Sequence, residues 1–477
     1  MTLMRRGRRP ISTERGTRSW PRALLLILVA LLPGPASAQH EGHDQPPPRP
    51  KPKPEKPAPE PARERRLFQS DMTLMTGMAP EDPLGDMPAR GWQWMNMGVV
   101  RLGYNHQSGD SGDEAVESTN WAMVMAYRPA GAGRITLMLM SSLEPATIPE
   151  RGSPQLFQTG EAFEGKPLVD RQHPHDLFMN LSATYRAPLS SHSAIWFQIA
   201  PAGEPALGPT AFMHRASAGE NPTAPLGHHW QDSSHITRNV ITGGGGWRRI
   251  TLEASGFHGE EPDEERWDLD GGDLDSGSGR AKLTLPRGWS GQLSHGYLHQ
   301  PEALEPGDTH RTTASIHYGA AGDRPNAASL VWGRNNEDHG VSDSFLAEYA
   351  HQVTVTDHLY GRFEWVEKDA DLLETKDLPE EEMGEATDQQ NIAEIAALTL
   401  GYFRSFGRFN PVRALMSGIG GDFTFYSIPS SLEPVYGDSP ISFHTFLRLR
   451  WGMPHGGDKD HQAPGHGAHH SMGAMRD

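Results

Sequence analysis

The sequence predicts an all-β fold, an antiparallel transmembrane β-barrel of about sixteen strands. From Gly91 onward, apolar and polar residues alternate with a period of two over short segments, which is the spacing of strands with two unlike faces. The mean hydropathy is −0.59, and no run of about 18 or more apolar residues follows the N-terminal region, which excludes a helical membrane protein. Transmembrane strands average out as hydrophilic, so a barrel fits both observations.

The alternating segments can be placed individually along the chain. In the segment Thr356–Glu367, the even-numbered residues from Tyr360 to Val366 face one way and the odd-numbered residues face the other. The strands are expected at Trp92–Tyr104, Asn120–Tyr127, Arg134–Ser141, Leu177–Arg186, Ser193–Ala200, His235–Thr242, Trp247–Phe257, Arg280–Leu285, Gly291–Leu298, Thr312–Tyr318, Ala327–Gly333, Ser342–Ala350, Thr356–Glu367, Ile392–Phe406, Val412–Tyr426 and Ile441–Trp451.

The connections between these segments alternate in length. Short links include Pro129–Gly133, Ala187–His192 and Gly243–Gly246, and long connections include Leu143–Asp176, Pro201–Ser234, His258–Gly279 and Arg334–Val341. Tight periplasmic turns and longer external loops are how outer-membrane barrels are built. The pattern therefore predicts an even strand count and places both termini in the periplasm of a bacterium. A large soluble β-sandwich or propeller is the alternative, but it does not predict this regular alternation.

The ends of the chain have compositions unlike the barrel. Residues 1–38 predict a secretory signal peptide, with a basic start, an apolar stretch and a small-x-small site at Ala36-Ser37-Ala38. Residues 39–90 predict a Pro-rich, Met-containing periplasmic tether, because such a segment stays extended and buries no core. The barrel is expected over residues 91–451, and residues 452–477 are expected to be a His/Gly-rich disordered tail.

Composition limits the chemistry and the partners. The 477 residues contain no Cys, which excludes disulfides, thiolate nucleophiles and Cys-based metal sites. The net charge is −17, so nucleic acid is not an expected partner, because binding it needs a basic face. The expected partners are outer-membrane lipid and a metal ion or small polar solute, and the prediction leaves room for a homo-oligomer.

Two predicted loops concentrate imidazoles and carboxylates, which are ligands for zinc, copper, nickel or iron. Because these loops flank one predicted strand pair, they leave the barrel as neighbours on one rim and can meet inside its mouth. The candidate metal ligands are His173, His175, Asp176, His228, His229, Asp232 and His235.

Two other interpretations of these loops stay open. The histidines can be solvated loop residues that pair with carboxylates. Alternatively, Arg171 or Arg215 can pair with Asp170, Asp176 or Glu220 and form a polar plug without any metal.

A second group of soft ligands lies at the two ends of the chain. The spacing of Met72, Met75 and Met78 suits a thioether set for Cu(I), although the same spacing is typical of an apolar helix face. The C-terminal tail adds His455, His461, His466, His469 and His470, a composition typical of metal binding. Together these ends favour copper or another late transition metal as the bound ion.

The loop motifs also carry a resemblance. The segment Gly160–Asp176, which contains Gln-His-Pro-His-Asp, and the segment Leu226–Thr237, which contains Gly-His-His-Trp-Gln-Asp-Ser-Ser-His, resemble a largely uncharacterised group of bacterial outer-membrane barrels over roughly residues 90–451. This resemblance implies the fold and no established activity. The His- and Met-rich ends are similar in composition to bacterial copper-resistance outer-membrane proteins, which implies copper handling.

Three functions can be weighed against these features of the sequence. The first is metal handling, efflux or resistance, with copper as the favoured metal. The alternative is a porin-like channel for small polar solutes with a loop constriction, since a sixteen-strand barrel is wide enough for an aqueous pore. An outer-membrane hydrolase built on Ser233 or Ser234 beside His235 is disfavoured, because adjacent loop residues rarely form a triad and no Gly-x-Ser-x-Gly elbow is present. We therefore expect a protein that is not an enzyme.

Overall fold

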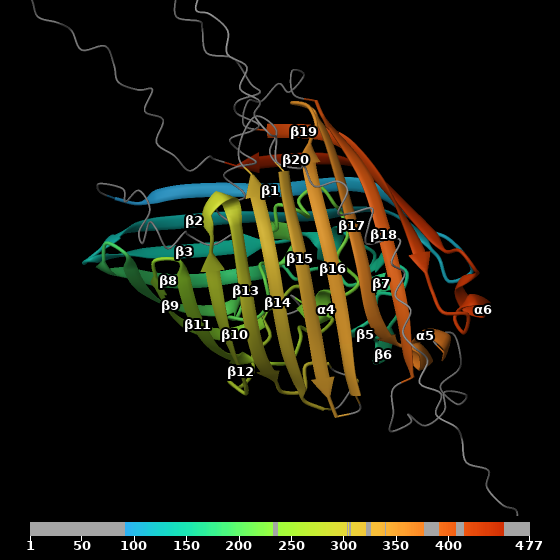
Figure 1. The fold of residues 1–477 in the computed structure, drawn as a ribbon, viewed down its shortest axis with the longest axis horizontal. Coiled ribbons are helices and arrows are strands. Elements are labelled where there is room, and N and C mark those ends of the chain that lie inside the picture. The colour runs from blue at the N-terminus through green and yellow to red at the C-terminus, as the bar shows by residue number, and fades with distance from the viewer. Residues whose placement is uncertain are drawn as a thin grey trace, which may run out of the picture. The chain divides into compact units, whose positions relative to one another are not determined.

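The structure, a computed structural model, describes residues 91–231, 237–302, 304, 307–320, 326–338, 340–375, 391–406 and 415–452. Sixteen strands form one closed barrel, in which consecutive strands are hydrogen-bonded neighbours and β1 closes the circle by pairing antiparallel with β20 (Figure 1). The predicted antiparallel barrel and its strand number are confirmed. No helix in these ranges is long and apolar enough to cross a membrane.

Every predicted strand has an observed counterpart, and most observed strands are longer. The barrel strands are β1 (Gln93–Gln107), β2 (Glu114–Ala130), β3 (Gly133–Ser141), β8 (Phe178–Ser190), β9 (Ser193–Gly203), β10 (Thr237–Trp247), β11 (Ile250–His258), β12 (Ser276–Thr284), β13 (Trp289–Leu298), β14 (Thr309–Ala320), β15 (Asn326–Glu337), β16 (Gly340–Gln352), β17 (Asp357–Asp369), β18 (Ile392–Ser405), β19 (Leu415–Ser427) and β20 (Ile441–Gly452).

The two faces of the barrel have the polarity of a membrane protein. In β20, Arg448 is 4% exposed, whereas its neighbours Leu447 and Leu449 are 49% and 42% exposed. The same inversion recurs around the barrel, with leucine, isoleucine and phenylalanine outside and arginine, glutamate, serine and threonine inside. Apolar side chains on the outer face are stable in contact with lipid, and the polar inner face lines the lumen.

The rule of alternating connection lengths holds with one exception among the described residues. Arg334–Val341 was predicted to be a long connection, but β15 ends at Glu337 and β16 begins at Gly340. The prediction was wrong because both strands extend beyond the part in which apolar and polar residues alternate. There Asn335 faces inward and Arg334 pairs with Asp343 of the next strand at 2.7 Å, so the alternation of polarity disappears.

A second correction concerns the glycine run Gly243–Gly246, which was predicted to be a short link. These residues lie inside β10, and the turn follows at Arg248 and Arg249. Glycine serves here for close packing, since a Cβ on Gly244 would lie 2.3 Å from the Trp196 ring of β9. Glycine has no side chain, so a run of four glycines in a strand shows no alternation of apolar and polar residues. The sequence of this run therefore resembles a turn.

The long connections contain short elements of their own. They are α3 (Glu144–Thr147), β4 (Ser153–Pro154), β5 (Glu161–Phe163), β6 (Lys166–Leu168), β7 (Arg171–Gln172), α4 (His228–Gln231), α5 (Ala370–Thr375), α6 (Glu433–Tyr436) and a 3₁₀ turn at Phe212–His214, while a 3₁₀ turn at Pro286–Gly288 occupies a short link. Around the fully buried Phe157, loop residues and the ends of β17 and β18 form a small apolar core. This core fixes the long-loop end of the barrel.

Candidate functional site

Three long connections form the candidate site. We call residues 142–177 the first loop, residues 204–236 the second loop and residues 259–275 the third loop; the second is described as far as Gln231. Each follows a barrel strand at the same rim, after β3, β9 and β11 respectively. The second loop contacts the inner face of the distant strands β16, β17 and β20, so it lies across the lumen.

A buried ion-pair triad attaches the second loop to the wall. Nε of Arg215 lies 3.0 Å from Oε2 of Glu348 in β16, and Nε of Arg362 in β17 lies 3.2 Å from Oε1 of the same carboxylate. Ser217 of the loop donates to Glu348 as well, at 3.1 Å. One carboxylate therefore compensates a guanidinium from the loop and one from the wall.

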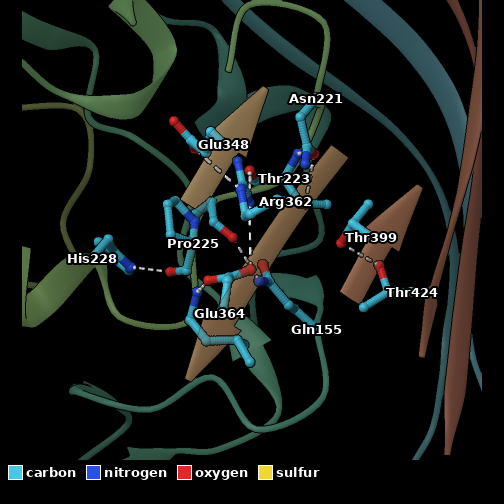
Figure 2. A network of polar contacts seen from close by, with 12 residues as sticks. Gln155, Asn221, Thr223, Pro225, His228, Glu348, Arg362, Glu364, Thr399 and Thr424 are labelled. Carbon is cyan, nitrogen blue, oxygen red and sulfur yellow. Dashed lines mark hydrogen bonds and ion pairs between the residues drawn. The ribbon is translucent and has the colours of Figure 1, made fainter. Parts of the chain in front are cut away.

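The following residues of the loop continue the attachment along β17. Nη1 of Arg362 donates to the carbonyl oxygen of Thr223 at 3.0 Å, and the backbone N–H of Leu226 donates to Oε2 of Glu364 at 2.6 Å. Figure 2 shows Arg362 and Glu364 on the wall with Thr223 and Pro225 of the loop beside them. Satisfying backbone groups with wall side chains allows a loop to be buried in the lumen.

Glu220 of the second loop forms an ion pair with Arg448 of β20, and Nδ1 of His358 in β17 lies 3.5 Å from Oε1 of Glu220. Arg101 of β1 donates to the Gly219 carbonyl at 2.9 Å. The second loop is thus held at several points around the barrel by charged residues that would otherwise face water in the lumen.

Three of the predicted ligand histidines meet where the first and second loops touch. Ligating nitrogens of His173, His228 and His229 lie within 4.8 Å of one another, and all three side chains are buried. The rings of His228 and His229, at the start of α4, are 4.0 Å apart between centroids. The His228 Nδ1 lies 3.0 Å from the Pro225 carbonyl oxygen and 2.9 Å from Nε2 of Gln158.

Two carboxylates that the sequence analysis did not single out complete the cluster. Nε2 of His173 lies 2.6 Å from Glu161 in β5, and Nδ1 of His229 lies 3.1 Å from Glu261 in the third loop. Glu161, His229 and Glu261 form a second trio of ligand atoms within 4.8 Å. Gly160, at φ +113°, permits the close approach, because a Cβ there would lie 3.1 Å from the His229 ring.

The remaining predicted ligands have other positions. His175 is bound to Glu144 of α3 at 2.7 Å, and Asp176 forms ion pairs with Arg238 of β10 and Arg266 of the third loop. Asp232, His235, Met72, Met75, Met78 and the tail residues His455, His461, His466, His469 and His470 lie outside the described residues, as do the predicted signal peptide, tether and tail.

Electrostatics stabilise the charged forms of the loop carboxylates. Burial alone would raise the pKa of Glu161, but His173 and Arg266 lower it to about 2. Burial likewise opposes ionisation of Glu144, and His175 outweighs it, so the pKa of Glu144 lies below its usual value. Burial would lower the pKa of His175, but Glu144 and Asp176 raise it. The first loop is therefore a dense network of buried opposite charges.

The donor set suits a borderline transition metal. Imidazole and carboxylate bind zinc, copper, nickel or iron. A tetrahedral ion with metal–nitrogen bonds of about 2.0–2.1 Å holds its ligands about 3.4 Å apart, so the observed cluster would close by shifts of about an ångström. An ion bound at Nε2 of His173 would take the place of the contact that this nitrogen makes with Glu161.

On the short-turn side of the second loop, the lumen remains open as a cavity of about 980 Å³. Its lining includes six basic side chains, Arg134, Arg186, Arg215, Arg280, Lys282 and Arg287, and two acidic ones, Glu204 and Glu253. Glu253 is paired with Arg280 and Lys282 at 2.9 and 3.1 Å. The excess of basic groups gives the cavity a positive potential, although the whole chain is acidic.

Some residues of the site could be identified from the sequence, and others could not. Glu348, Arg362 and Glu364 are charged residues on the inner face of predicted strands, which marks them as lumen residues but does not name their loop partners. Glu161 and Glu261 are ordinary loop carboxylates, and only the fold brings them to the histidines. Of the two loop arginines that were predicted to form a polar plug, Arg215 pairs with Glu348 of the wall and Arg171 with Asp113.

The outward apolar face, the polar lumen and the closed ring of strands define a transmembrane β-barrel whose lumen is crossed by a loop. No family model and no curated protein matches the chain. Among solved structures, it is similar to an anion-selective porin from Comamonas acidovorans, with a TM-score of 0.46 and 10% identity over 76% of this chain and 100% of that chain.

It is also similar to the outer-membrane protein OmpT of Vibrio cholerae (TM-score 0.44, 8% identity, 77% of this chain and 100% of that chain) and to the outer-membrane channel DcaP of Acinetobacter baumannii (TM-score 0.41, 9% identity, 78% and 100%). Identities this low transfer neither activity nor substrate.

Proposed function

We propose that the protein is an outer-membrane channel for small polar solutes, anions above all, and that the second loop forms its constriction. The observation that carries the proposal is the attachment of this loop across the lumen through Arg215, Glu348 and Arg362. A sixteen-strand barrel encloses an aqueous lumen, and a loop fixed inside it sets the width of the path.

The outer face supports the membrane assignment. Large apolar side chains such as Leu330, Leu359 and Leu400 are half-exposed on strands whose inner faces are polar. In a membrane this band is covered by acyl chains, and closure of the barrel satisfies the backbone groups that lipid cannot. Outer-membrane lipid is therefore the proposed partner of the outer face.

The lining of the cavity supports the choice of solute. Six basic groups against two acidic ones raise the local concentration of anions and lower that of cations. Lys282 and Arg287 lie at the short-turn end of this cavity, where a solute passes between the periplasm and the constriction in the predicted orientation. We therefore expect a small organic or inorganic anion to pass more readily than a cation of the same size.

Ion selectivity in a planar bilayer tests this function. The reversal potential across a salt gradient should indicate anion preference, and Lys282→Gln combined with Arg287→Gln should shift it toward cations. Arg404→Gln is the matched control, because Arg404 is exposed and does not line the cavity. A purified barrel that does not conduct, or whose selectivity is unchanged by the double substitution, would contradict the proposal.

A second candidate function is transition-metal handling, with copper foremost, and the convergence of His173, His228 and His229 favours it. Titration calorimetry of the full chain with Cu(II) and Zn(II) tests it. His173→Ala and His228→Ala should each remove one tight metal equivalent, whereas His192→Ala, in an exposed turn, should not. The histidines of the tails are common to all variants, so equal stoichiometry in every variant would contradict a metal site in the loops.

A further inference from the structure

The methionines of the described chain are gathered on one part of the lumen wall. Eight of the nine lie on β1, β2, β3, β8 and the second loop, and Met416 of β19 is the exception. Three strands each carry a Met-x-Met pair, at Met95 and Met97, Met123 and Met125, and Met138 and Met140. Residues two apart in a strand share a face, so each pair points to one side of the sheet.

The strand register aligns these pairs into two rows. Met97 lies opposite Met123, and Met123 lies opposite Met140 in the next strand. Met95, Met125 and Met138 form the second row by the same pairing. Met97 and Met140 are 3% and 4% exposed and form a buried cluster with Met179, against which Met123 and Met213 pack.

The second loop adds a nitrogen ligand to this cluster. Nε2 of His214 lies 3.3 Å from Sδ of Met140, and the His214 ring meets Trp121 edge-on at 4.9 Å between centroids. Metal–sulfur and metal–nitrogen bonds of about 2.3 and 2.0 Å, as in zinc sites, would span this separation at an angle of about 100°, which is near tetrahedral.

We propose that the methionine rows and His214 form a binding site for a soft monovalent cation such as Cu(I) or Ag(I) in the lumen wall. Thioethers are soft, neutral ligands that select such ions over Mg²⁺, Ca²⁺ or Na⁺. Met97, Met123 and Met140 supply sulfur, and His214 supplies the imidazole nitrogen. This site is separate from the His173, His228 and His229 cluster, which holds no thioether.

The alternative role of these side chains is apolar filling, for which methionine is well suited. Apolar packing alone does not require a sulfur atom, and leucine, which has a similar volume, would pack equally well at these positions. The methionine rows line the same cavity as the basic residues but lie farther from the short turns: on β3 the inward face runs from Arg134 beside the short turn through Thr136 to Met138 and Met140. The proposal rests on the channel only for access of the ion, because binding itself does not require conduction.

Silver binding by the full chain in detergent, measured by equilibrium dialysis in chloride-free buffer, tests the proposal. The wild type should bind one more tight Ag(I) equivalent than a variant with Met97→Leu, Met123→Leu and Met140→Leu, which keeps volume and apolarity. Met416→Leu, outside the cluster, should match the wild type. The sulfurs and imidazoles of the tails are present in every variant and cancel in the comparison.

His214→Gln gives a second measurement that does not alter the wall. It should weaken the same silver equivalent by at least about tenfold, since even outer-shell partners of a metal ligand are worth that much. Retention of wild-type stoichiometry by the folded triple variant, or of wild-type affinity by His214→Gln, would overturn the proposal. A wild-type barrel that conducts but does not bind this silver equivalent would contradict the soft-ion site and leave the channel proposal standing. A barrel that binds silver but does not conduct would contradict the channel proposal and leave the soft-ion site standing.

Discussion

Replacing Glu348 by glutamine should release the second loop from the lumen wall. Glu348 is 2% exposed, and its carboxylate is the shared partner of Arg215 from the loop and Arg362 from the wall. The substitution keeps the shape of the side chain and removes its charge. Two guanidiniums then remain buried without the carboxylate that they share, and the Glu364 carboxylate lies 3.8 Å from Arg362.

The size of the effect follows from the loss of this shared carboxylate. Removing one partner of a buried ion pair costs about 3–5 kcal/mol, because the other charge stays buried without compensation. This cost destabilises the docked state relative to the undocked state, because water can solvate Arg215 once the loop leaves the wall. A change of this size multiplies the ratio of undocked to docked loop by roughly 10² to 10⁴.

Single-channel recording measures the outcome directly. Glu348→Gln should give a larger conductance or frequent transitions to a larger one, and its second loop should be cut faster by protease. Asp343→Asn is the matched control on the same strand, because its pair with Arg334 is partly exposed and worth about 1 kcal/mol. A double variant with Arg215→Met should recover thermal stability while keeping the larger conductance, since no orphaned charge remains.

Wild-type conductance and protease resistance in the Glu348→Gln variant would refute this reasoning. They would show that the loop is positioned by other contacts, such as the Glu220–Arg448 ion pair and the Leu226 N–H to Glu364 hydrogen bond.

Further predictions concern pH, the histidine cluster and the lipid face. Burial would raise the pKa of Glu220, but Arg448 and its other basic neighbours hold it below the ordinary value of 4.5, so its stabilisation of the docked loop is present above that value. This stabilisation is lost as the pH falls below 4.5, and conductance should rise there in the wild type but not in Glu220→Gln. Gly160→Ala should cost about 1–3 kcal/mol of unfolding free energy, because alanine is strained at its positive φ and crowds His229, and metal affinity in calorimetry should fall with it. Leu330→Arg should cost about 2–4 kcal/mol near the membrane midplane, measured by urea unfolding in lipid vesicles.

The barrel could be predicted because the alternation of polarity is a local property of each strand. Every strand needs one face for lipid and one for the lumen, so the pattern recurs wherever the chain crosses the membrane. The prediction was wrong where that requirement is absent. In β10 the glycines carry no side chain to alternate, and at the end of β15 the strand extends beyond its apolar section, so polar residues occupy both faces.

The site could be predicted only in part, because it depends on contacts between loops. Adjacent long loops on one rim indicated that histidines from Gly160–Asp176 and from Leu226–Thr237 can meet, and His173, His228 and His229 do so. The partners Glu161 and Glu261 depend on how the first and third loops fold, which no local pattern encodes. The Met-x-Met pairs were a readable signal, since three strands repeat them, but their alignment required the strand register.

The way in which the second loop is attached bears on what the lumen can do. A loop held by apolar contacts would gain free energy from burial, whereas buried ion pairs gain little over the water they replace. They are demanding in geometry, however, because any displacement of Arg215 or Glu220 leaves a charge uncompensated. Leu207, Met213 and Leu226 of this loop also pack in apolar clusters, so apolar burial favours the docked loop while the ion pairs define its position. Because His214 is one residue from Arg215, a change in that attachment also moves the imidazole relative to the methionine rows. The proposed constriction and the proposed soft-ion site are thus coupled through one short segment of the loop.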